Sequence, residues 1–477
     1  MRVIGLFLTL LLVCKAASRQ VDFCYAEDED PYLYLASKTS YHFVHGGKTR
    51  FQTVPECQPV QIWMASRHGA RYPKVESVNK LSDLPKLREQ IVYNHEHRGN
   101  GHLCNQDLDN LKLWNPNPNL TPDMALKLTP EGAEDSMLFG RRLQSNFPEI
   151  LQPNIADITA DNYKFRSTNS ERTRASMESF MEGLFGSKNA VYPVDVPNGN
   201  DNFLKAYRNC SKWQEDDPSV SEERDKFAAM TDVAQNISRR LGFQYTLAIP
   251  TVNLMYDMCR FEKAWEVSKL SAWCAPFSKE ELNVMEYMED LYYYYAIGNG
   301  RKMNAQLGCP ILQDMYNNFK QLERGNLTGK PRGVFYFTHT FTLLSLFTAM
   351  GIANDPEPLL ASNYRQMTKR QFRTSFIAPF NANLVAVFYR CKNPDAPNKV
   401  MFYLQEKPLM FEGCQVGLCD WEYLKNKFSN VFSECDPNFC SNENGSASNR
   451  AWSTISVLIP FVIFLMRKVN EFPARLE

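Results

Sequence analysis

Two short apolar runs, PVQIWMA at residues 59–65 and VFYFT at 334–338, are rich in β-branched and aromatic residues. Runs of this length and composition are typical of strands buried on both faces. Two further runs, NLVAVFYRC (383–391) and KVMFYLQ (399–405), flank the turn-forming segment KNPDAPN. They predict an antiparallel hairpin at the end of the same sheet.

Helical patterns occupy the sequence between these runs. In LTPEGAEDSMLFGRRLQSNF, Thr129 is a predicted N-cap, Pro130 is suited to the first turn, and Glu131 adds an acid near the positive end of the helix dipole. SERTRASMESFMEGLFG (170–186) and KEELNVMEYMEDLYYYYAIG (279–298) also have helical patterns. We therefore predict an α/β fold with a mixed central sheet flanked by helices and split by a mainly helical insertion.

The chain of 477 residues exceeds one ordinary hydrophobic core, so we expect two lobes. The α/β domain is predicted in two parts, residues 19–175 and 331–440. The mainly helical inserted domain is predicted at 176–330. Residues 1–18 and 441–477 differ in composition from this body and are interpreted separately.

The N-terminus, MRVIGLFLTLLLVCKAAS, has one basic residue, an apolar run and then small residues. This order is typical of a secretory signal peptide cleaved near Ser18. The alternative, a membrane anchor, is weaker because the run is too short to cross about 30 Å of hydrocarbon. We therefore expect a protein of the secretory pathway.

The C-terminus has a polar spacer, then AWSTISVLIPFVIFLM, then RKVNEFPARLE. A small-residue site, spacer and apolar tail resemble a GPI lipid-anchor signal. Arg467 and Lys468 instead suit the cytoplasmic flank of a short membrane span. We expect membrane attachment at the cell surface through this segment, or secretion, and both mechanisms of attachment stay open.

Cysteine number and glycosylation sequons agree with export. Removal of Cys14 with the signal peptide leaves twelve of the thirteen cysteines, an even number that predicts disulfides. Cys259/Cys274 and Cys414/Cys419 are the expected local pairs, while the sequence leaves the other pairings open. The sequons that predict a glycoprotein begin at Asn119, Asn209, Asn236, Asn326 and Asn444.

The chain has 53 basic and 53 acidic residues, so no global field selects nucleic acid or an anionic membrane. Any anion site must therefore be local. SRHGARYP, at residues 66–73, places Arg67 and Arg71 around His68 at the end of a predicted strand. Guanidinium groups bind phosphate oxygens bidentately and stay charged, so His68 is a candidate nucleophile toward phosphorus. A solvated basic loop or a structural histidine in the core is the alternative interpretation.

The wider pattern favours phosphate chemistry. RHGARYP matches the RHGxRxP signature of the histidine acid phosphatases, a branch of the histidine phosphatase superfamily. Within that branch the chain resembles the multiple inositol polyphosphate phosphatases over nearly all of its mature length. The other segments that carry the resemblance are LTPEG with GRR (128–142), STNSERTRASMESFMEGL (167–184), EDLYYYYAIGNG (289–300), CPILQDM (309–315), FTHTFTLLSL (337–346), APFNANLVAVFYRC (378–391) and LQEKPLMFEGC (404–414).

The resemblance implies a role for each matching residue. His68 is the implied nucleophile and forms a phosphohistidine that water hydrolyses. Arg67, Arg71 and Arg172 are implied to hold the phosphate, and His339 to donate a further hydrogen bond to it. Three guanidinium groups then supply the electrostatic stabilisation, so no metal and no cofactor is expected.

The same resemblance implies the substrates and the fold. Inositol polyphosphates, from the hexakisphosphate downwards, are the implied substrates, and 2,3-bisphosphoglycerate or other phosphomonoesters are further candidates. The family fold is an α/β domain with a helical domain inserted between the two catalytic histidines. Gly69 is expected to let the backbone turn tightly and approach the phosphate, and Tyr72 and Pro73 to fix the turn.

The sequence departs from the family pattern after the second histidine. The family has His-Ala-Glu or His-Asp at this place, whereas the chain has His339, Thr340 and Phe341. The family carboxylate protonates the leaving oxygen, and loss of a positioned acid costs roughly 10² to 10⁴ in rate. Phenylalanine has no proton to donate.

Three hypotheses account for Phe341. Another acid supplies the proton, either a neighbouring substrate phosphate or one of Asp290, Asp355 and Glu357. Alternatively, the substrate has a more acidic leaving group, such as a phosphoanhydride or an acyl phosphate. In the third hypothesis, the chain is a catalytically impaired relative that binds polyphosphorylated ligands.

Two other patterns are weaker candidates. NHEHRGNGH contains His95, His97 and His102, but its glycine-rich setting favours a mobile surface loop over a metal site. The run Tyr292 to Tyr295 is interpreted as core-facing aromatics on a helix rather than a ligand-stacking surface. No GxSxG motif accompanies either catalytic histidine, which disfavours serine hydrolase chemistry.

Overall fold

The computed structural model describes residues 20–440, except residues 30, 47–50, 197–200, 215–218, 415 and 437. The predicted signal peptide and the predicted anchor segment lie outside the described residues. Within the part that is described, no helix combines the length and apolar character needed to cross a membrane.

One mixed β-sheet forms the centre of the α/β part, as predicted. Its strand order is β2-β3-β1-β4-β5-β6, and β7 pairs with β5. β1, β2 and β3 are parallel to one another, whereas β4 and β5 form the predicted antiparallel hairpin. The strands within the described residues are β1 (Cys57–Arg67), β2 (Tyr163–Ser167), β3 (Gly333–Thr338), β4 (Asn383–Cys391), β5 (Asn398–Leu404), β6 (Lys407–Pro408) and β7 (Leu418–Asp420).

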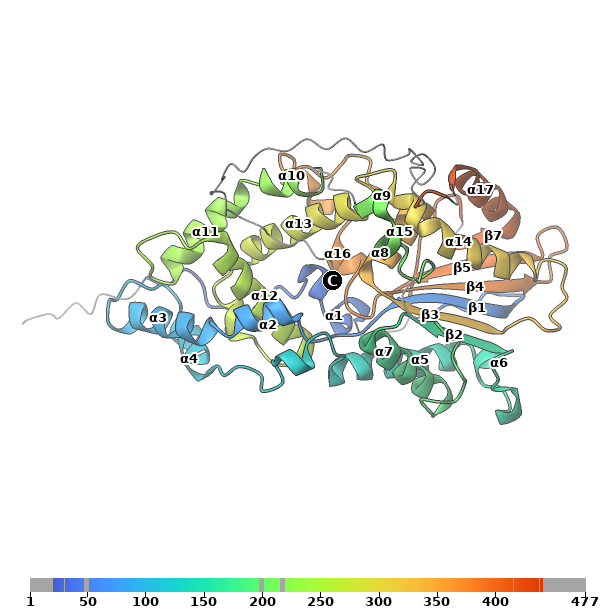
Figure 1. Ribbon diagram of the computed structural model, residues 1–477, viewed down its shortest axis with the longest axis horizontal. Helices are drawn as coiled ribbons and strands as arrows, with labels where there is room; N and C mark the ends of the chain where they lie inside the picture. The colour runs from blue at the N-terminus through green and yellow to red at the C-terminus, as the bar shows by residue number, and fades with distance from the viewer. Residues whose placement is uncertain are drawn as a thin grey trace, which may run out of the picture.

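Helices cover both faces of this sheet (Figure 1). Along β1 the side chains alternate, so that Ile62 and Met64 join one hydrophobic cluster while Trp63 and Ala65 join the other. The first cluster includes residues of α5 and α7, and the second includes residues of α14, α15 and α17. These helices are α5 (Pro130–Asn146), α7 (Glu171–Phe185), α14 (Asn304–Lys320), α15 (Thr340–Met350) and α17 (Trp421–Glu434).

The predicted helix starts are confirmed at two places. The Thr129 side chain accepts a hydrogen bond from the Gly132 amide at 3.2 Å, and Pro130 is the first residue of α5. α13 begins with a capping box in which Ser278 and Glu281 satisfy each other's backbone amides. Local capping therefore sets the start of both helices.

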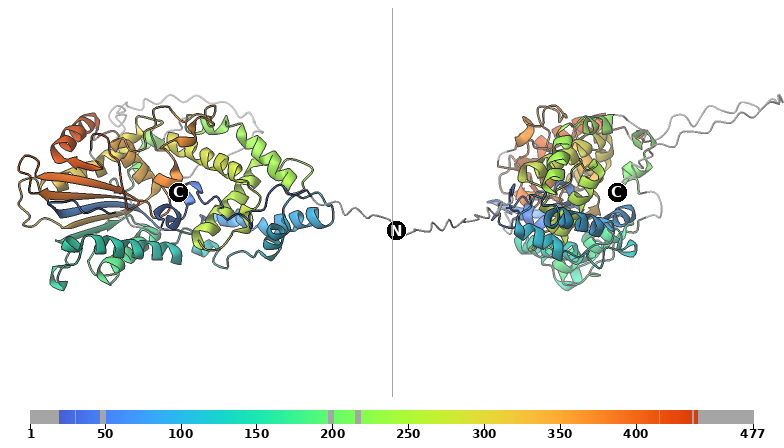
Figure 2. Two further views of the ribbon diagram at one scale, coloured as in Figure 1. Left: turned by 180° about the vertical axis from the view of Figure 1, so that it is seen from behind. Right: turned by 90° about the vertical axis from the view of Figure 1, so that its left-hand side faces the viewer.

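A second group of helices lies beyond one end of the sheet (Figures 1 and 2). It is built from two stretches of chain, α2 to α4 and α10 to α13, rather than from one insertion at 176–330. The predicted boundary between residues 175 and 176 falls inside α7, which packs against α5 beside the sheet. The remaining helices are α1 (Tyr41–His45), α2 (Val75–Leu81), α3 (Leu84–Glu96), α4 (Asn105–Leu113), α6 (Pro148–Leu151), α8 (Ala206–Asn209), α9 (Ser211–Gln214), α10 (Ser219–Asp225), α11 (Ala229–Arg240), α12 (Ile249–Trp265), α13 (Lys279–Ala296) and α16 (Thr374–Ile377).

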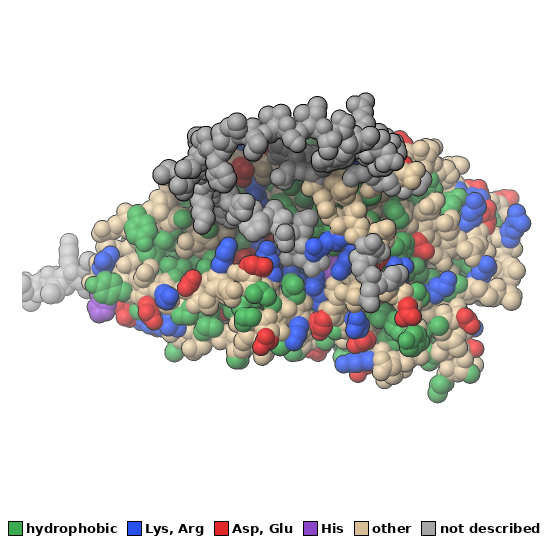
Figure 3. Space-filling model, viewed as in Figure 1, with side chains coloured by type: hydrophobic (Ala, Val, Ile, Leu, Met, Phe, Trp, Pro, Cys, Tyr) green, Lys and Arg blue, Asp and Glu red, His purple; other side chains and the backbone are tan. Residues whose placement is uncertain are grey.

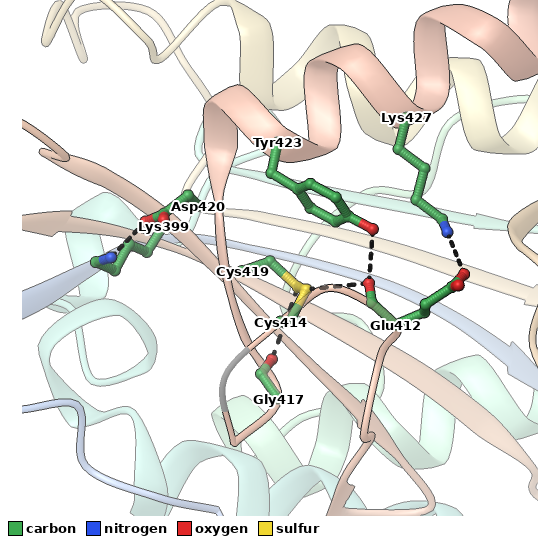
Figure 4. Close-up of a disulfide and its surroundings, with 8 residues drawn as sticks. All are labelled: Lys399, Glu412, Cys414, Gly417, Cys419, Asp420, Tyr423 and Lys427. Carbon is green, nitrogen blue, oxygen red and sulfur yellow. Dashed lines mark hydrogen bonds and ion pairs between the residues drawn. A yellow bond between two sulfur atoms is a disulfide. The ribbon is translucent and has the colours of Figure 1, made fainter.

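The described chain contains six disulfides: four join residues far apart in the sequence, and two are the predicted local pairs. Figure 4 shows the shortest loop, Cys414–Cys419, beside α17, where Tyr423 donates to the Glu412 carbonyl at 2.8 Å. The pairs are Cys24–Cys104, Cys57–Cys391, Cys210–Cys440, Cys259–Cys274, Cys309–Cys435 and Cys414–Cys419.

Of the three histidines of NHEHRGNGH, His97 is exposed as expected of a surface loop, whereas His95 and His102 are packed against other segments. His95 lies in the last turn of α3, is 4% exposed, and accepts a hydrogen bond from the Leu103 amide at 3.2 Å. His102 contacts Asp22 at 3.0 Å. The ends of this stretch are therefore packed, while the residues from Glu96 to Asn100 between them are exposed. Among the described residues, the only cluster of potential metal ligands is Cys24, Cys104 and Asp107, whose two sulfur atoms form a disulfide.

Candidate active site

The register of the parallel strands brings the two predicted catalytic histidines together. Arg67, the last residue of β1, is paired with Thr338, the last residue of β3. His68 and His339 therefore follow at the same edge of the sheet, and their ring centroids are 5.6 Å apart. Crevices at the carboxyl ends of parallel strands are the usual ligand sites of such sheets.

A cavity of about 380 Å³ opens at this edge, and all five predicted site residues line it. Figure 3 shows basic side chains gathered near the middle of this face of the molecule. Among the residues that the structure describes, two carboxylates, Asp257 and Glu289, line the cavity. Its basic side chains are Lys38, Arg67, Arg71, Lys74, Arg172, Arg224 and Arg260.

The contacts of His68 favour the protonation state that a nucleophile requires. Its Nδ1 lies 2.9 Å from the Gly69 carbonyl oxygen, which can only accept a hydrogen bond. We therefore assign the proton to Nδ1, which leaves the lone pair on Nε2. Burial, together with the charges of Arg172 and Arg67, holds the pKa of His68 well below its usual value. The imidazole is thus neutral at physiological pH.

The arginines are positioned by backbone carbonyl groups. Arg67 donates to the carbonyls of Ser37 and Ala378, and its guanidinium lies 4.5 Å from the ring centroid of Phe380. Burial lowers the pKa of Arg67 to about 10, so it remains charged at neutral pH. Arg71 donates to the Tyr72 carbonyl at 2.8 Å. These contacts orient positive charge beside His68 before any ligand binds.

His339 contacts Arg172 through one ring nitrogen and Thr168 through the other. Arg172 lies 3.3 Å from Nδ1, and Thr168 Oγ1 lies 3.0 Å from Nε2. Because a guanidinium can only donate, Nδ1 accepts and Nε2 carries the proton of the neutral ring. The predicted hydrogen bond from His339 to phosphate therefore requires a proton on Nδ1, supplied either by the other tautomer or by protonation of the ring.

Gly69 allows a close approach between the loop and α5. A Cβ atom there would overlap the backbone of Gly132, and a Cβ on Gly132 would overlap the backbone of Ala70. Glycine is therefore required here by packing, and the expected approach of the loop to phosphate stays a prediction. Pro73, which we expected only to fix the turn, lines the cavity, whereas Tyr72 is buried against Trp265.

An aromatic cluster occupies the place of the family carboxylate. Phe341 lines the cavity, and its ring centroid lies 5.2 Å from that of Tyr207, 5.8 Å from Trp213 and 5.9 Å from Tyr293. The tight ring contacts on three sides indicate that the site is packed for an apolar side chain.

The acids suggested as replacements do not line the cavity. Asp290 is buried against Arg370 and Thr374. Asp355 accepts from the backbone amides of Gln371 and Phe372, and Glu357 is likewise absent from the lining. Tertiary contacts that the sequence does not reveal thus commit these carboxylates elsewhere.

Several residues that line the cavity were not predicted from the sequence, because they lie on separate elements of the fold. Lys38 comes from the 3-10 helix Ala36–Lys38, Arg260 from α12, and Glu289 from α13. Tyr292 and Tyr293 also line the cavity, so our interpretation of them as core aromatics was incomplete. The spacing of 289, 292 and 293 on one helix face was the signal available in the sequence.

Glu289 is held as an anion by its neighbours. Burial alone would raise its pKa, but Arg260 and Lys38 outweigh burial and lower it to about 2. Its Oε2 lies 3.0 Å from Arg260 and 3.7 Å from Lys38. Glu289 therefore orients the basic side chains and has no proton to donate at neutral pH.

Comparison with known proteins agrees with this geometry. The family model of the histidine phosphatase superfamily (branch 2) matches residues 60–405. The chain belongs to this superfamily. Among its relatives is multiple inositol polyphosphate phosphatase 1 of Drosophila melanogaster, which is 38% identical over 445 residues, covering 91% of this chain and 93% of the relative. The human protein of the same name is 28% identical over 460 residues, covering 86% of this chain and 90% of its own.

Solved structures show the same fold for this histidine phosphatase. The phytase from D. castellii superimposes with a TM-score of 0.68 at 18% identity, covering 85% of this chain and 89% of the phytase. Multiple inositol polyphosphate phosphatase from Bifidobacterium longum, in complex with inositol hexasulfate, gives a TM-score of 0.60 at 14% identity. That match covers 80% of this chain and 94% of the bacterial protein.

Proposed function

We propose that this histidine phosphatase removes phosphate groups from inositol polyphosphates, including inositol hexakisphosphate, through a phosphohistidine at His68. The observation that carries the proposal is the neutral, buried His68 between Arg67, Arg71 and Arg172 in one cavity. A neutral imidazole is a nucleophile, and the three guanidinium groups stabilise the charge of the transferring phosphoryl group.

The charge of the cavity favours a substrate with several phosphates. Seven basic side chains line it, more than one phosphate group can contact. The relatives named multiple inositol polyphosphate phosphatase, and the related structure that contains inositol hexasulfate, support the same substrate class.

The mechanism has two phosphoryl transfers. In the first, Nε2 of His68 attacks phosphorus, and the inositol oxygen leaves with a proton. In the second, water attacks the phosphohistidine and releases inorganic phosphate. α15 begins directly after His339, and Thr340 and Phe341 from its first turn line the cavity, so the positive end of its dipole favours the anion.

The test is phosphate release from inositol hexakisphosphate by the full-length chain produced in a eukaryotic secretory pathway. His68→Ala should abolish release, because it removes the nucleophile. His97→Ala is the matched control, since His97 is exposed and does not line the cavity. Release that persists in His68→Ala would refute the assignment of the nucleophile.

The same experiment tests the binding-only alternative suggested by Phe341. Saturable binding of inositol hexakisphosphate without turnover, lost in Arg71→Ala, would identify a binding protein. Turnover by the parent chain would exclude that alternative.

We propose that the protein is exported and acts at the cell surface or outside the cell. The signal-like N-terminus, the six disulfides and the exposure of Asn119, Asn209, Asn236 and Asn326 in their sequons support this proposal. Treatment of intact cells with phosphatidylinositol-specific phospholipase C should release the protein if the tail is a lipid-anchor signal. Retention on the cells until detergent is added would favour a membrane span.

A further inference from the structure

The proposed reaction needs a proton that position 341 cannot supply. An inositol alkoxide is a poor leaving group, so the first transfer requires an acid beside the leaving oxygen. Apart from the histidines and arginines already assigned, five lysine and tyrosine side chains with a proton to donate line the described part of the cavity. They are Lys38, Lys74, Tyr207, Tyr292 and Tyr293.

The two carboxylates among the described lining residues are engaged in ion pairs. Asp257 Oδ1 accepts from Arg260 Nε at 2.8 Å, and Glu289 pairs with Arg260 and Lys38. Each therefore already balances a guanidinium charge, and neither replaces the protonated carboxyl group of the family.

Lys38 is linked through Ser37 to both Arg67 and the aromatic cluster around Phe341. Its Nζ donates to Ser37 Oγ at 3.3 Å, and Ser37 Oγ donates to the Tyr293 hydroxyl at 3.2 Å. Tyr293 packs against Phe341, while the Ser37 carbonyl accepts from Arg67. One short segment thus links Lys38 both to Arg67 and to the Phe341 position.

We propose that Lys38 is the catalytic proton donor of this enzyme and replaces the carboxylic acid that the family places at position 341. The inference rests on the proposed phosphatase function. Its basis is the position of the ammonium group in the same cavity as His68, Arg67 and Phe341.

The proposed cycle is balanced in protons and bonds. As Nε2 of His68 bonds to phosphorus, the bond from phosphorus to the inositol oxygen breaks, and that oxygen takes a proton from the Lys38 ammonium. Lys38 is then a neutral amine. When water attacks the phosphohistidine, the bond from phosphorus to nitrogen breaks, and the amine accepts the proton of the water molecule.

The surroundings of Lys38 give it an acidity suited to this role. Burial and the charges of Arg260 and Arg71 lower its pKa, Glu289 and Asp257 oppose them, and the result is about 7. A general acid is most efficient when its pKa lies near the working pH. Burial raises the pKa of the Tyr293 phenol, which makes it the weaker acid.

The decisive comparison uses two leaving groups. Lys38→Arg keeps a positive charge, but a guanidinium does not give up its proton. We expect kcat for inositol hexakisphosphate to fall roughly 10²-fold or more, and kcat for p-nitrophenyl phosphate, whose leaving group needs no acid, to fall less than about tenfold. Lys38→Met should behave in the same way.

Lys74→Met is the matched control for loss of one positive charge from the same cavity. It should raise KM, more for inositol hexakisphosphate than for p-nitrophenyl phosphate, and leave the ratio of the two kcat values close to that of the parent. Full turnover of inositol hexakisphosphate by Lys38→Arg, or equal losses on the two substrates, would overturn the proposal. Retained hydrolysis of p-nitrophenyl phosphate also shows that the variant is folded.

The pH profile supplies a second readout that a purely structural lysine would not change. Activity of the parent on inositol hexakisphosphate should decline on the alkaline side as Lys38 loses its proton. Bound phosphates move this limb to higher pH because they stabilise the ammonium. The residual activity of Lys38→Arg should lack the limb, and an unchanged limb would contradict the proposal.

Failure of the substrate assignment is distinguishable from failure of this inference. If the parent hydrolyses p-nitrophenyl phosphate and glycerol 2-phosphate but not inositol hexakisphosphate, the substrate proposal fails. The role of Lys38 is then tested by comparing kcat for glycerol 2-phosphate, whose alcohol is a poor leaving group, with kcat for p-nitrophenyl phosphate. If the parent hydrolyses none of the three, both proposals are wrong.

Discussion

The chemistry of single residues in this site depends on burying positive charge next to a neutral histidine. Arg67, Arg71 and Arg172 are each at least nine-tenths buried, so their charges act on His68 through protein rather than water. The same charges that attract phosphate therefore also disfavour the imidazolium form.

This coupling predicts the acid side of the pH profile. Because the pKa of His68 is lowered, kcat/KM should hold as pH falls through 6.5 and decline only at lower pH, where the nucleophile is protonated. Arg172→Gln removes the nearby charge that lowers this pKa most, so the acid limb should move to higher pH. The measurement is kcat/KM from pH 3 to 8 with p-nitrophenyl phosphate.

Arg172→Lys is the control for this experiment, since it keeps a positive charge and should leave the acid limb nearly in place. A parent limb at 6.5, or a limb that Arg172→Gln leaves unmoved, would contradict the assignment of that limb to His68.

How far the sequence predicted the site also depends on individual residues. Arg67, His68 and Arg71 form one motif, and Arg172 and His339 lie in segments that match the family, so their positions in the cavity were predictable. Lys38, Arg260 and Glu289 each come from a different helix, and only the tertiary fold brings them together. Asp290, Asp355 and Glu357, which the sequence offered as alternative acids without placing them, do not line the cavity, and this too is decided by the tertiary fold.

At the level of secondary structure, α5 and α7 form the support from which Arg172 projects. The helices meet through glycine, because a Cβ on Gly140 would overlap the Phe180 carbonyl and a Cβ on Gly183 would overlap the Met137 carbonyl. Glycine costs a helix interior about 1 kcal/mol relative to alanine. The close packing of the two helices offsets this cost.

This contact predicts that Gly183→Ala destabilises the protein in spite of its better helix propensity. The added methyl group forces α5 and α7 apart, and we expect a loss of about 1–3 kcal/mol in the free energy of unfolding. Chemical unfolding monitored by circular dichroism measures it. Ser145→Ala, at an exposed position of α5, is the control and should change stability by less than about 0.5 kcal/mol. An unchanged or increased stability of Gly183→Ala would contradict the backbone contact.

The elements themselves were largely predictable, because the strand runs and the capping residues are local signals. The division into domains was not, since the helices beyond the sheet come from two stretches on either side of α5 and α7. Sequence continuity suggested one insertion at 176–330, but packing of α7 and α14 against the sheet divides the chain differently.

Across the whole molecule, disulfides fix the ends of the described chain to its body. Cys309–Cys435 joins α14 to the end of α17 across 126 positions, whereas Cys414–Cys419 closes a loop of only 5. Neither bond involves a residue that lines the cavity. Removing either bond should therefore change the stability of the fold without changing the residues that line the cavity.

Removing each disulfide should destabilise the protein by an amount that increases with the logarithm of the loop length it closes. A cross-link limits the unfolded chain more when the loop is longer, so loop-closure entropy predicts about 5 kcal/mol for Cys309→Ala/Cys435→Ala and about 2 kcal/mol for Cys414→Ala/Cys419→Ala. Thermal unfolding of the parent and of both double variants measures which variant loses more stability. Phosphate release at 25 °C should persist in both, because the cavity is intact in the folded fraction. Equal losses of stability would show that native contacts around the bonds, rather than constraint of the unfolded chain, determine their contribution.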